Sequence, residues 1–412
     1  MPGRTIDAEV GSIGGRGDGI AETEEGRFYI PFTLPGDRLR LTVRGGEVTA
    51  AERVADGPDR RPPQCRHFGD CGGCALQHVD DVAYAAWKRE RVVEAHARRG
   101  LDADVALTIR IAPGSRRRVR LGARAIAKGL VLGFKARRSH RLVDVSECPV
   151  ARPEIVALLS PLRDALSDCL SGGAAAEVSV TSADGGLDVA VDTGTALDLA
   201  KRERLADFAT RADLARLSWA DEPVVQRRPP RALFAGIAVD LPLGAFLQPT
   251  EAGEAALRDI IAAALGPAEM VADLFAGCGA FSVPLAMAGK HVRAFDAADG
   301  QSDALSRASR DPRLGARLTA ETRDLERRPL AASELAALDG IALDPPRAGA
   351  AAQIREIAAS AVPVVAYASC NPSTFARDAR TLVDGGYRLE TVTPIDQFLW
   401  SAEVELAGVF RR

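Results

Sequence analysis

The chain has 412 residues, of which 47% are hydrophobic and 26% are charged, the balance of an ordinary globular protein rather than of a disordered tail. That length exceeds one domain, and no apolar run approaches the roughly 18 residues that span a bilayer, so we expect two or three folding units and no membrane segment. The net charge of −3 does not by itself point to nucleic acid, and the first residues lack a basic segment followed by an apolar stretch, which predicts a cytoplasmic protein.

Residues 1–57 alternate short apolar runs with glycines, as in Gly14-Gly15-Arg16-Gly17. Short strands separated by such turns predict a small β-barrel. These glycines lack the strand before and the helix after that a dinucleotide site requires, so we interpret them as turn residues. The Pro-rich stretch that follows indicates a linker.

Residues 58–235 mix helical and strand patterns. Between Arg98 and Arg141 there are 13 Arg or Lys residues but only two acids. Clustered positive charge predicts a surface that binds the phosphates of a nucleic acid. The alternative is a general surplus, because the chain holds 48 Arg and only five Lys. The expected helices are 82–99 and 153–170, and the expected strands include 178–180 and 187–191.

Four of the seven cysteines have a spacing that suggests a metal site: Cys65, Cys71, Cys74 and Cys148. Disulfides are rare in a cytosolic chain of this length. The two glycines between Cys71 and Cys74 let the backbone wrap closely around a metal. Three closely spaced cysteines plus a distant one followed by proline favour a 4Fe-4S cluster. Zinc, which more often uses two paired knuckles, and plain buried cysteines are the alternatives.

Residues 236–412 change to alternating strands and helices, which predicts a parallel sheet with helices on both faces. In such sheets ligands bind at the carboxyl ends of the strands, so we expect a nucleotide or nucleoside site there. The expected strands are 270–275, 291–296, 341–344 and 362–369. The polar residues at their ends are Asp273 with the turn Gly277-x-Gly279, then Asp296, Asp344 and Cys370.

One enzyme family shares four motifs with this chain. They are Asp273-Leu-Phe275-Ala-Gly277-Cys-Gly279, Asp344-Pro-Pro-Arg347-Ala-Gly349, Ser369-Cys370-Asn371-Pro372 and Cys71-Gly-Gly-Cys74. Together they resemble the S-adenosylmethionine-dependent RNA 5-methyluridine methyltransferases, most closely the ribosomal RNA branch that carries an iron–sulfur cluster. The resemblance implies an α/β fold with a Rossmann-like class I methyltransferase domain at 236–412. It also implies an N-terminal TRAM-like (OB) β-barrel at 1–57 that binds RNA, and a mixed α+β central domain at 58–235 that carries the cysteine cluster and the Arg-rich surface.

The chemistry of that family explains the residue types. Carbon 5 of uracil is too weak a nucleophile to take a methyl group, so a thiolate must first add to carbon 6 and a base must later remove the proton from carbon 5. By resemblance, Cys370 is the nucleophile and Glu405 is the general base, although an outward-facing surface glutamate is the alternative for Glu405. The implied cofactors are S-adenosylmethionine and a 4Fe-4S cluster bound by Cys65, Cys71, Cys74 and Cys148. The implied S-adenosylmethionine contacts are Gln248, Phe275, Gly277, Asp296 and Asp344.

The implied substrate is RNA, with 23S ribosomal RNA expected from the cluster-bearing branch, and we expect a monomer whose target uridine flips into the site. Several positions depart from the family pattern, and Glu403 stands where the family has a histidine. The other departures are Thr250, Ala280 and Asp296. Three alternatives stay open: methylation of transfer RNA, methylation of a base nitrogen, which Asp344-Pro-Pro would also suit, and RNA binding without catalysis.

Overall fold

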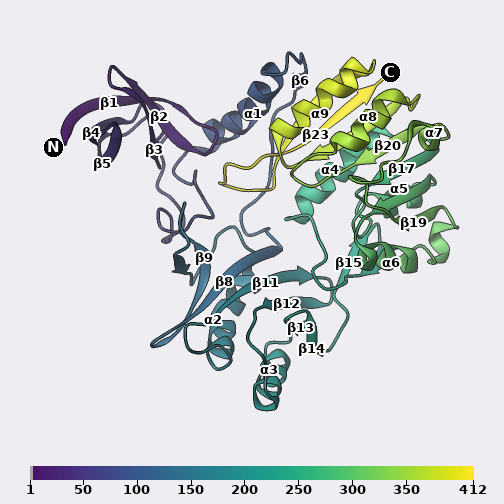
Figure 1. Ribbon diagram of the computed structural model, residues 1–412, viewed down its shortest axis with the longest axis horizontal. Helices are drawn as coiled ribbons and strands as arrows, with labels where there is room; N and C mark the ends of the chain where they lie inside the picture. Colours follow the sequence, from purple (N-terminus) through teal and green to yellow (C-terminus); the bar gives the residue numbers. More distant parts are fainter. Residues whose placement is uncertain (1–2) are drawn as a thin grey trace.

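The computed structural model describes residues 3–412, which form four β-sheets and nine α-helices. Figure 1 shows the strands as separate N-terminal, central and C-terminal groups, coloured purple, teal, and green to yellow. None of the helices in residues 3–412 combines the length and the apolar character needed to cross a membrane.

The N-terminal sheet has five antiparallel strands. They are β1 (Arg4–Ile13), β2 (Asp18–Thr23), β3 (Gly26–Pro31), β4 (Arg38–Arg44) and β5 (Glu47–Ala55), in the spatial order β3-β2-β1-β4-β5. Alternating residues such as Leu39 and Leu41 of β4 face inward and form a small core. Within the described residues the edge strands β3 and β5 approach each other without being hydrogen-bonded, so closure into the expected barrel stays a prediction.

The central sheet has seven strands, and helices α2 (Pro153–Ser167) and α3 (Leu199–Arg211) pack against it. The strands, in spatial order, are β10 (Leu142–Asp144), β9 (Gly129–Lys135), β8 (Arg118–Ile126), β11 (Ala175–Ala183), β12 (Gly186–Asp192), β13 (Arg216–Trp219) and β14 (Glu222–Gln226). Strand β8 alternates: Val119 and Leu121 are buried, whereas Arg120 and Arg124 project from the opposite, exposed face. A hairpin of β15 (Arg231–Phe234) and β16 (Ile237–Asp240) follows.

The C-terminal sheet has nine strands and carries the parallel core that the sequence predicts. Its parallel strands, in spatial order, are β19 (Leu318–Thr322), β18 (His291–Asp296), β17 (Met270–Leu274), β20 (Gly340–Leu343) and β21 (Val364–Ser369). Strand β23 (Glu405–Arg411) then lies antiparallel between β21 and β22 (Arg388–Asp396). All four strands expected from residues 270–369 are therefore present.

Helices cover both faces of this sheet, over two separate hydrophobic cores. They are α4 (Glu251–Ala264), α5 (Ser282–Met287), α6 (Asp299–Ala308), α7 (Ala332–Leu335), α8 (Ala351–Ala359) and α9 (Pro372–Asp384), with a single 3-10 turn at Pro312–Leu314. Local signals set where two of them begin. Thr250 caps α4 by accepting a hydrogen bond from the backbone of Gly253, and Asn371 caps α9, whose first residue is Pro372.

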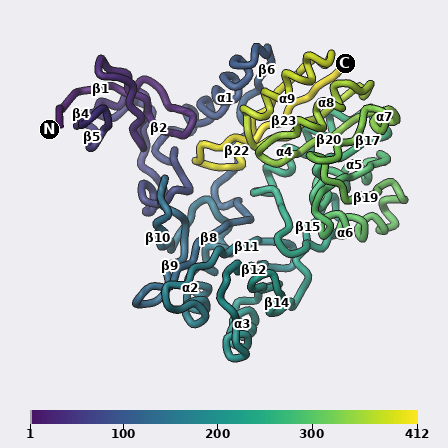
Figure 2. Tube along the Cα trace, in the orientation of Figure 1, coloured from purple at the N-terminus to yellow at the C-terminus, as the bar shows by residue number. Residues whose placement is uncertain are grey.

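Residues 81–110 precede the central sheet in sequence but pack against the C-terminal one. Helix α1 (Asp81–Ala97) contacts α9 and β22, and the short strands β6 (Asp104–Val105) and β7 (Ile109–Arg110) extend the sheet by pairing with β22. Figures 1 and 2 both show this segment beside α9. The edge of β22 is thereby covered by backbone from far earlier in the chain.

A buried polar cluster fixes α1 to the loop of residues 397–404, which joins β22 to β23. Lys88 is fully buried, and its Nζ lies 3.0 Å from Oδ1 of Asp396, the last residue of β22. Lys88 also donates to the backbone carbonyls of Phe398, at 3.3 Å, and of Glu403. Tyr84 donates its hydroxyl to Asp396 at 2.9 Å. Burial shifts the pKa of Lys88 down and that of Asp396 up, and the attraction between the two opposes both shifts.

Trp400 anchors the middle of the same loop. Its backbone has φ of +57°, a conformation that costs a bulky residue about 1–3 kcal/mol unless its surroundings impose it. Here they do. The amide of Trp400 donates to the Tyr84 hydroxyl at 2.6 Å, and its carbonyl accepts from the amides of Ala75 at 2.8 Å and Leu76 at 3.0 Å. The segment that follows Cys74 is thus bonded directly to the loop between β22 and β23.

We predict that Lys88→Met destabilises the protein by about 3–5 kcal/mol, because it leaves the buried Asp396 carboxylate without its cation. Urea unfolding checks this. Arg98→Met, at the end of the same helix, removes an exposed pair with Glu94 and should cost under about 1 kcal/mol. The double variant Lys88→Met/Asp396→Leu should recover most of the loss. Equal stabilities for Lys88→Met and Arg98→Met would contradict the account.

Candidate functional site

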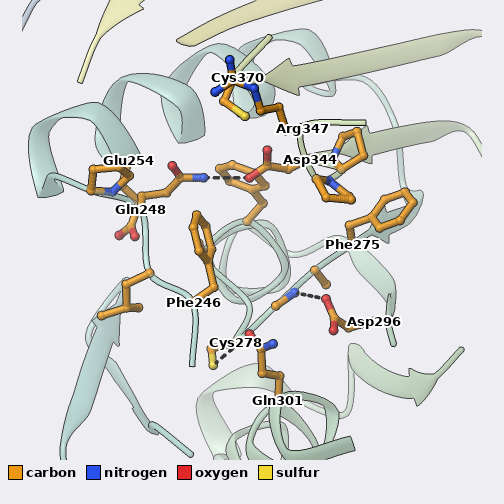
Figure 3. A pocket seen from close by; sticks show the side chains of 18 of the residues that line it. Phe246, Gln248, Glu254, Phe275, Cys278, Asp296, Gln301, Asp344, Arg347 and Cys370 are labelled. Atoms are coloured by element: carbon orange, nitrogen blue, oxygen red, sulfur yellow. Dashed lines mark hydrogen bonds between the residues drawn. The ribbon is translucent and has the colours of Figure 1, made fainter. Parts of the chain in front are cut away.

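A pocket of about 710 Å³ opens at the carboxyl ends of β17, β18, β20 and β21. Figure 3 shows it from close by, with Gln248 pointing toward Asp344 and with Cys370 and Arg347 above them. All seven residues that the sequence suggested for catalysis and cofactor binding line this one pocket. They are Cys370, Glu405, Gln248, Phe275, Gly277, Asp296 and Asp344.

One chain of hydrogen bonds joins the two pocket carboxyls. Gln248 donates from Nε2 to Oδ2 of Asp344 at 2.7 Å. Gln397 donates from Nε2 to Oε1 of Gln248 at 2.9 Å and to Oε2 of Glu405 at 2.8 Å. Sequence reasoning missed Gln397; its only signal there is its place directly after a strand, beside Asp396. Glu405 is buried, which excludes the alternative of an outward-facing surface residue.

Burial makes the carboxyls of this pocket weak acids. It raises the pKa of Asp344 to about 7, helped by the charge of Asp273, while the hydrogen bond from Gln248 opposes the rise. Asp273, buried behind it, also has its pKa raised to about 7 by burial, although Ser282 donates a hydrogen bond to it. Burial, and next the charge of Asp344, raise the pKa of Glu405 well above its usual range. Asp344 and Asp273 therefore exchange protons near neutral pH, whereas Glu405 holds its proton more tightly than an exposed glutamate does.

Cys370 lies at the turn between β21 and α9, half-buried at the wall of the pocket. Burial and then the charges of Glu405 and Asp344 raise the pKa of its thiol to about 11, and the Arg347 guanidinium opposes them. Arg347 is held at both its backbone carbonyl and its side chain. Asn371 donates from Nδ2 to its carbonyl at 3.1 Å, and Glu403 forms an ion pair with its guanidinium at 2.8 Å. Glu403 is therefore bound to a pocket residue.

The turn after β17 has the shape of a nucleotide-binding loop. Phe275 has φ of +61° and Gly277 has φ of +56°, so the backbone reverses sharply beside the pocket. Asp296 braces the turn by accepting from the amides of Gly277 and Ala298, both at 2.9 Å. A Cβ on Gly279 would lie 2.5 Å from the Leu305 side chain, so only glycine fits there. This close-packed cradle with an acid at its rim fits an adenosine-type ligand.

Thr250 and Ala280 are the two other positions that depart from the family pattern, and the structure gives each a place that the sequence alone did not. Thr250 caps helix α4, and Ala280 lines the pocket after the glycine turn.

Arginines from the central sheet line the opposite wall. Arg116, Arg118 and Arg120 project from one side of β8 and of the residues before it. The Arg118 guanidinium lies 5.9 Å from the ring of Phe246, which is half exposed, and that of Arg116 lies 6.0 Å from the ring of Phe398. Three arginines of the basic stretch thus face the pocket, where cations and aromatic rings together suit an RNA strand.

The four cysteines of the expected cluster lie in one region, all free and partly buried. Burial, followed by neighbouring groups that include the Cys148 thiol, raises the pKa of Cys65 and Cys71, and it raises that of Cys74 to about 12. Four thiols this close suit iron or zinc as a donor set. Among residues 3–412, however, no three His, Cys, Asp or Glu side chains converge closely enough to enclose a metal ion. The cluster therefore stays a prediction.

Comparison with known proteins points to one family. Residues 239–412 match the family described as tRNA (Uracil-5-)-methyltransferase. The chain is 46% identical over 404 residues to a protein of Mesorhizobium japonicum named as an RNA methyltransferase, across 97% of this chain and 96% of the relative. It is 35% identical to the 23S rRNA (uracil(1939)-C(5))-methyltransferase RlmD of Halomonas elongata, across 94% of this chain and 86% of the relative.

The fold has a counterpart among solved structures. The tRNA (uracil-54, C5)-methyltransferase of Pyrococcus abyssi, solved in complex with S-adenosyl-L-homocysteine, superposes with a TM-score of 0.74. The match covers 98% of this chain and 100% of that one at 20% sequence identity, so it establishes a shared fold.

We predict that the free protein alkylates slowly at Cys370 at neutral pH. With a pKa of about 11, the reactive thiolate should increase about tenfold per pH unit between about pH 7 and pH 9.5, whereas an ordinary thiol levels off near its pKa of about 8.5. Iodoacetamide labelling followed by peptide mass spectrometry measures the rate at this residue. Arg347→Gln should slow it further, because the cation that favours the thiolate is lost. A plateau near pH 8.5 would contradict the prediction.

Proposed function

The chain belongs to the S-adenosylmethionine-dependent RNA (uracil-5-)-methyltransferases, and on that premise we propose that it methylates carbon 5 of one uridine in 23S ribosomal RNA through a covalent bond to Cys370. The observation that carries the proposal is the meeting of Cys370, Asp344 and Glu405 in one pocket. The choice of 23S ribosomal RNA is supported by the Halomonas elongata relative. Transfer RNA is the second candidate, favoured by the family description.

The pocket residues supply the nucleophile and the base for this reaction. The Cys370 thiolate bonds to carbon 6 of the flipped uracil, and the electron pair of the double bond moves to carbon 5, which attacks the methyl group. S-Adenosylmethionine, when bound, would supply that methyl group, and its sulfur would keep the electrons of the broken bond to the methyl carbon and leave as S-adenosylhomocysteine. Glu405 then takes the proton from carbon 5, the bond from sulfur to carbon 6 breaks, and 5-methyluridine leaves as the thiolate re-forms.

The thiol must lose its proton before it attacks. With a pKa of about 11 in the free protein, only a small fraction of this thiol is ionised at neutral pH. A substrate that fills the pocket brings an electrophilic carbon to the sulfur, and Arg347 is the cation at hand to stabilise the developing charge. Asp344, with a pKa of about 7, is suited to hold or release a proton beside the uracil.

The two walls of the pocket divide the binding tasks. Gln248, Phe275, Gly277 and Asp296 would hold S-adenosylmethionine, whose ribose hydroxyls suit an acid at a strand end. The arginine wall of β8 would hold RNA phosphates next to the flipped base. We further propose that residues 1–57 act as a TRAM-like RNA-binding unit, 58–235 as the cluster-bearing unit and 236–412 as the catalytic unit of a monomer in the cytoplasm.

We predict that the protein forms 5-methyluridine in an unmodified 23S ribosomal RNA transcript and not in transfer RNA transcripts, as measured by nucleoside mass spectrometry. Cys370→Ala should lower the rate by roughly a thousandfold or more, because no other group replaces the nucleophile. Glu405→Gln should slow release by roughly a hundredfold to ten-thousandfold and leave methylated RNA bound to the protein on a denaturing gel.

Cys169→Ala is the matched control, because this thiol is buried in the core of the central sheet, away from the pocket. Methylation of a base nitrogen that survives Cys370→Ala would replace the proposal with a nitrogen methyltransferase. RNA binding without any affinity for S-adenosylmethionine in calorimetry would favour a non-catalytic role.

We also propose that Cys65, Cys71, Cys74 and Cys148 bind a 4Fe-4S cluster. Protein purified without oxygen should then contain iron and acid-labile sulfide in equal amounts and absorb visible light. Cys74→Ser should lose both, whereas Cys169→Ser should keep them. Zinc in place of iron and sulfide, or no metal at all, would overturn this part of the proposal.

A further inference from the structure

Gln397 is a buried amide whose contacts the reaction scheme does not yet use. It follows Asp396 directly at the end of β22, with 1% of its surface exposed. Its Nε2 donates to Glu405 on one side and to Gln248 on the other, at 2.8 and 2.9 Å. It is thus in direct contact with the side chain proposed as the base.

In the structure these hydrogen bonds all run toward the two carboxyls. Both N–H groups of Gln397 are used, and Gln248 accepts at Oε1 while its own Nε2 donates to Asp344. Turning the Gln397 amide over would set its oxygen against an oxygen of Gln248 and an oxygen of Glu405. The observed arrangement therefore ends at two carboxylate acceptors, and a carboxylate accepts best when it is ionised.

Helix α4 is shaped to fit this amide. A Cβ on Gly253 would lie 2.6 Å from Oε1 and 2.8 Å from Cβ of Gln397, closer than real contacts allow. Glycine inside a helix costs about 1 kcal/mol relative to alanine, so its presence in the first turn of α4 calls for a reason. The space that it leaves holds Gln397 and also the Thr250 hydroxyl, whose oxygen would lie 2.8 Å from the same Cβ.

We propose that Gln397 is a positioning residue for Glu405: it holds one carboxyl oxygen in place and leaves the other oxygen aimed at carbon 5 of the methylated uracil. This inference rests on the proposed function. Oε2 of Glu405 accepts from Gln397, and Oε1 has no partner among the described residues.

The surroundings of Glu405 otherwise favour its neutral form. Asp344 faces it from β20 and Cys370 faces it from β21, and neither supplies a positive charge. Glu254 of the neighbouring helix α4 is already paired with Arg117, the residue before β8. Burial and the charge of Asp344 raise the pKa of Glu405, and the hydrogen bond from Gln397 is what lowers it. Loss of that bond raises the pKa further, so the base is protonated over a wider range of pH.

Loss of the hydrogen bond from Gln397 should affect only one step of the reaction. Addition of the Cys370 thiolate and transfer of the methyl group do not use Glu405, whereas removal of the proton from carbon 5 does. A protein without the Gln397 donor should therefore methylate the RNA and then fail to release it. The covalent intermediate accumulates, which a general loss of folding or of binding would not produce.

The test compares Gln397→Met with the wild-type holoprotein on an unmodified 23S ribosomal RNA transcript. Methionine has a similar volume and no N–H donor. Denaturing gels with radiolabelled S-adenosylmethionine count the methylated covalent adduct, and its release is followed as a function of pH. We expect release to slow about tenfold to a hundredfold at neutral pH, the worth of one hydrogen bond to a charged group, and to recover as the pH is raised.

Two further variants sharpen the result. Gly253→Ala should also accumulate adduct by displacing Gln397. The double variant Gly253→Ala/Gln397→Met should release RNA no more slowly than Gln397→Met alone. Gln353→Met is the matched control. Gln353 is a buried glutamine of helix α8 that bonds the backbone of Leu330, away from the pocket. The Gln353→Met protein should be less stable to unfolding but should not accumulate the covalent adduct.

The outcomes separate this inference from the proposed function. If Glu405→Gln traps RNA and Gln397→Met does not, or if Gln397→Met slows turnover with an unshifted pH profile and no adduct, the positioning role is wrong while the proposed function stands. If neither the wild-type protein nor Glu405→Gln transfers a methyl group to carbon 5 of uridine, the proposed function fails and this inference fails with it.

Discussion

The buried ion pair between Lys88 and Asp396 is the interaction on which the geometry of the pocket depends. Removing two charges from water is expensive, and Tyr84 and two backbone carbonyls offset part of that cost by adding hydrogen bonds to the pair. Apolar packing alone has no direction. The ion pair and hydrogen bonds of this cluster are directional. They therefore fix the end of β22 and, with it, the loop that leads from Gln397 to Glu405. Trp400, bonded to the segment after Cys74, fixes the middle of that loop.

The pocket balances two opposing demands on its acids. A carboxylate removed from water is a stronger base, but the same burial favours its protonation. The amides of Gln248 and Gln397 sit between Asp344 and Glu405, where they offer each acid a donor without introducing a positive charge. A cation there would hold both acids ionised but would weaken them as bases. Neutral amide donors favour the ionised form of each acid without that loss of basicity.

The sequence was sufficient for features that depend on local patterns. The strands ending near Asp273, Asp296, Asp344 and Cys370 were predictable because parallel topology gathers strand ends at one edge. Contacts set by tertiary packing could not be predicted from the sequence. Lys88 in an otherwise charged helix has the pattern of a surface lysine, yet it is buried against a strand from the other end of the chain. Gly253 and Gln397 carry no motif, and their fit exists only where α4 meets the end of β22. Likewise, nothing in residues 81–110 indicated that they complete the C-terminal sheet.

The distance between these partners in the chain affects how the protein is made. Tyr84 and Asp396 are 312 residues apart, and β6 and β7 pair with a strand that is translated almost last. At roughly 5–20 residues per second, helix α1 waits about 15–60 s on the ribosome for its partner. During that time Lys88 and an apolar helix face remain uncovered. The N-terminal and central sheets can form as they emerge, but the pocket can assemble only once the chain is essentially complete.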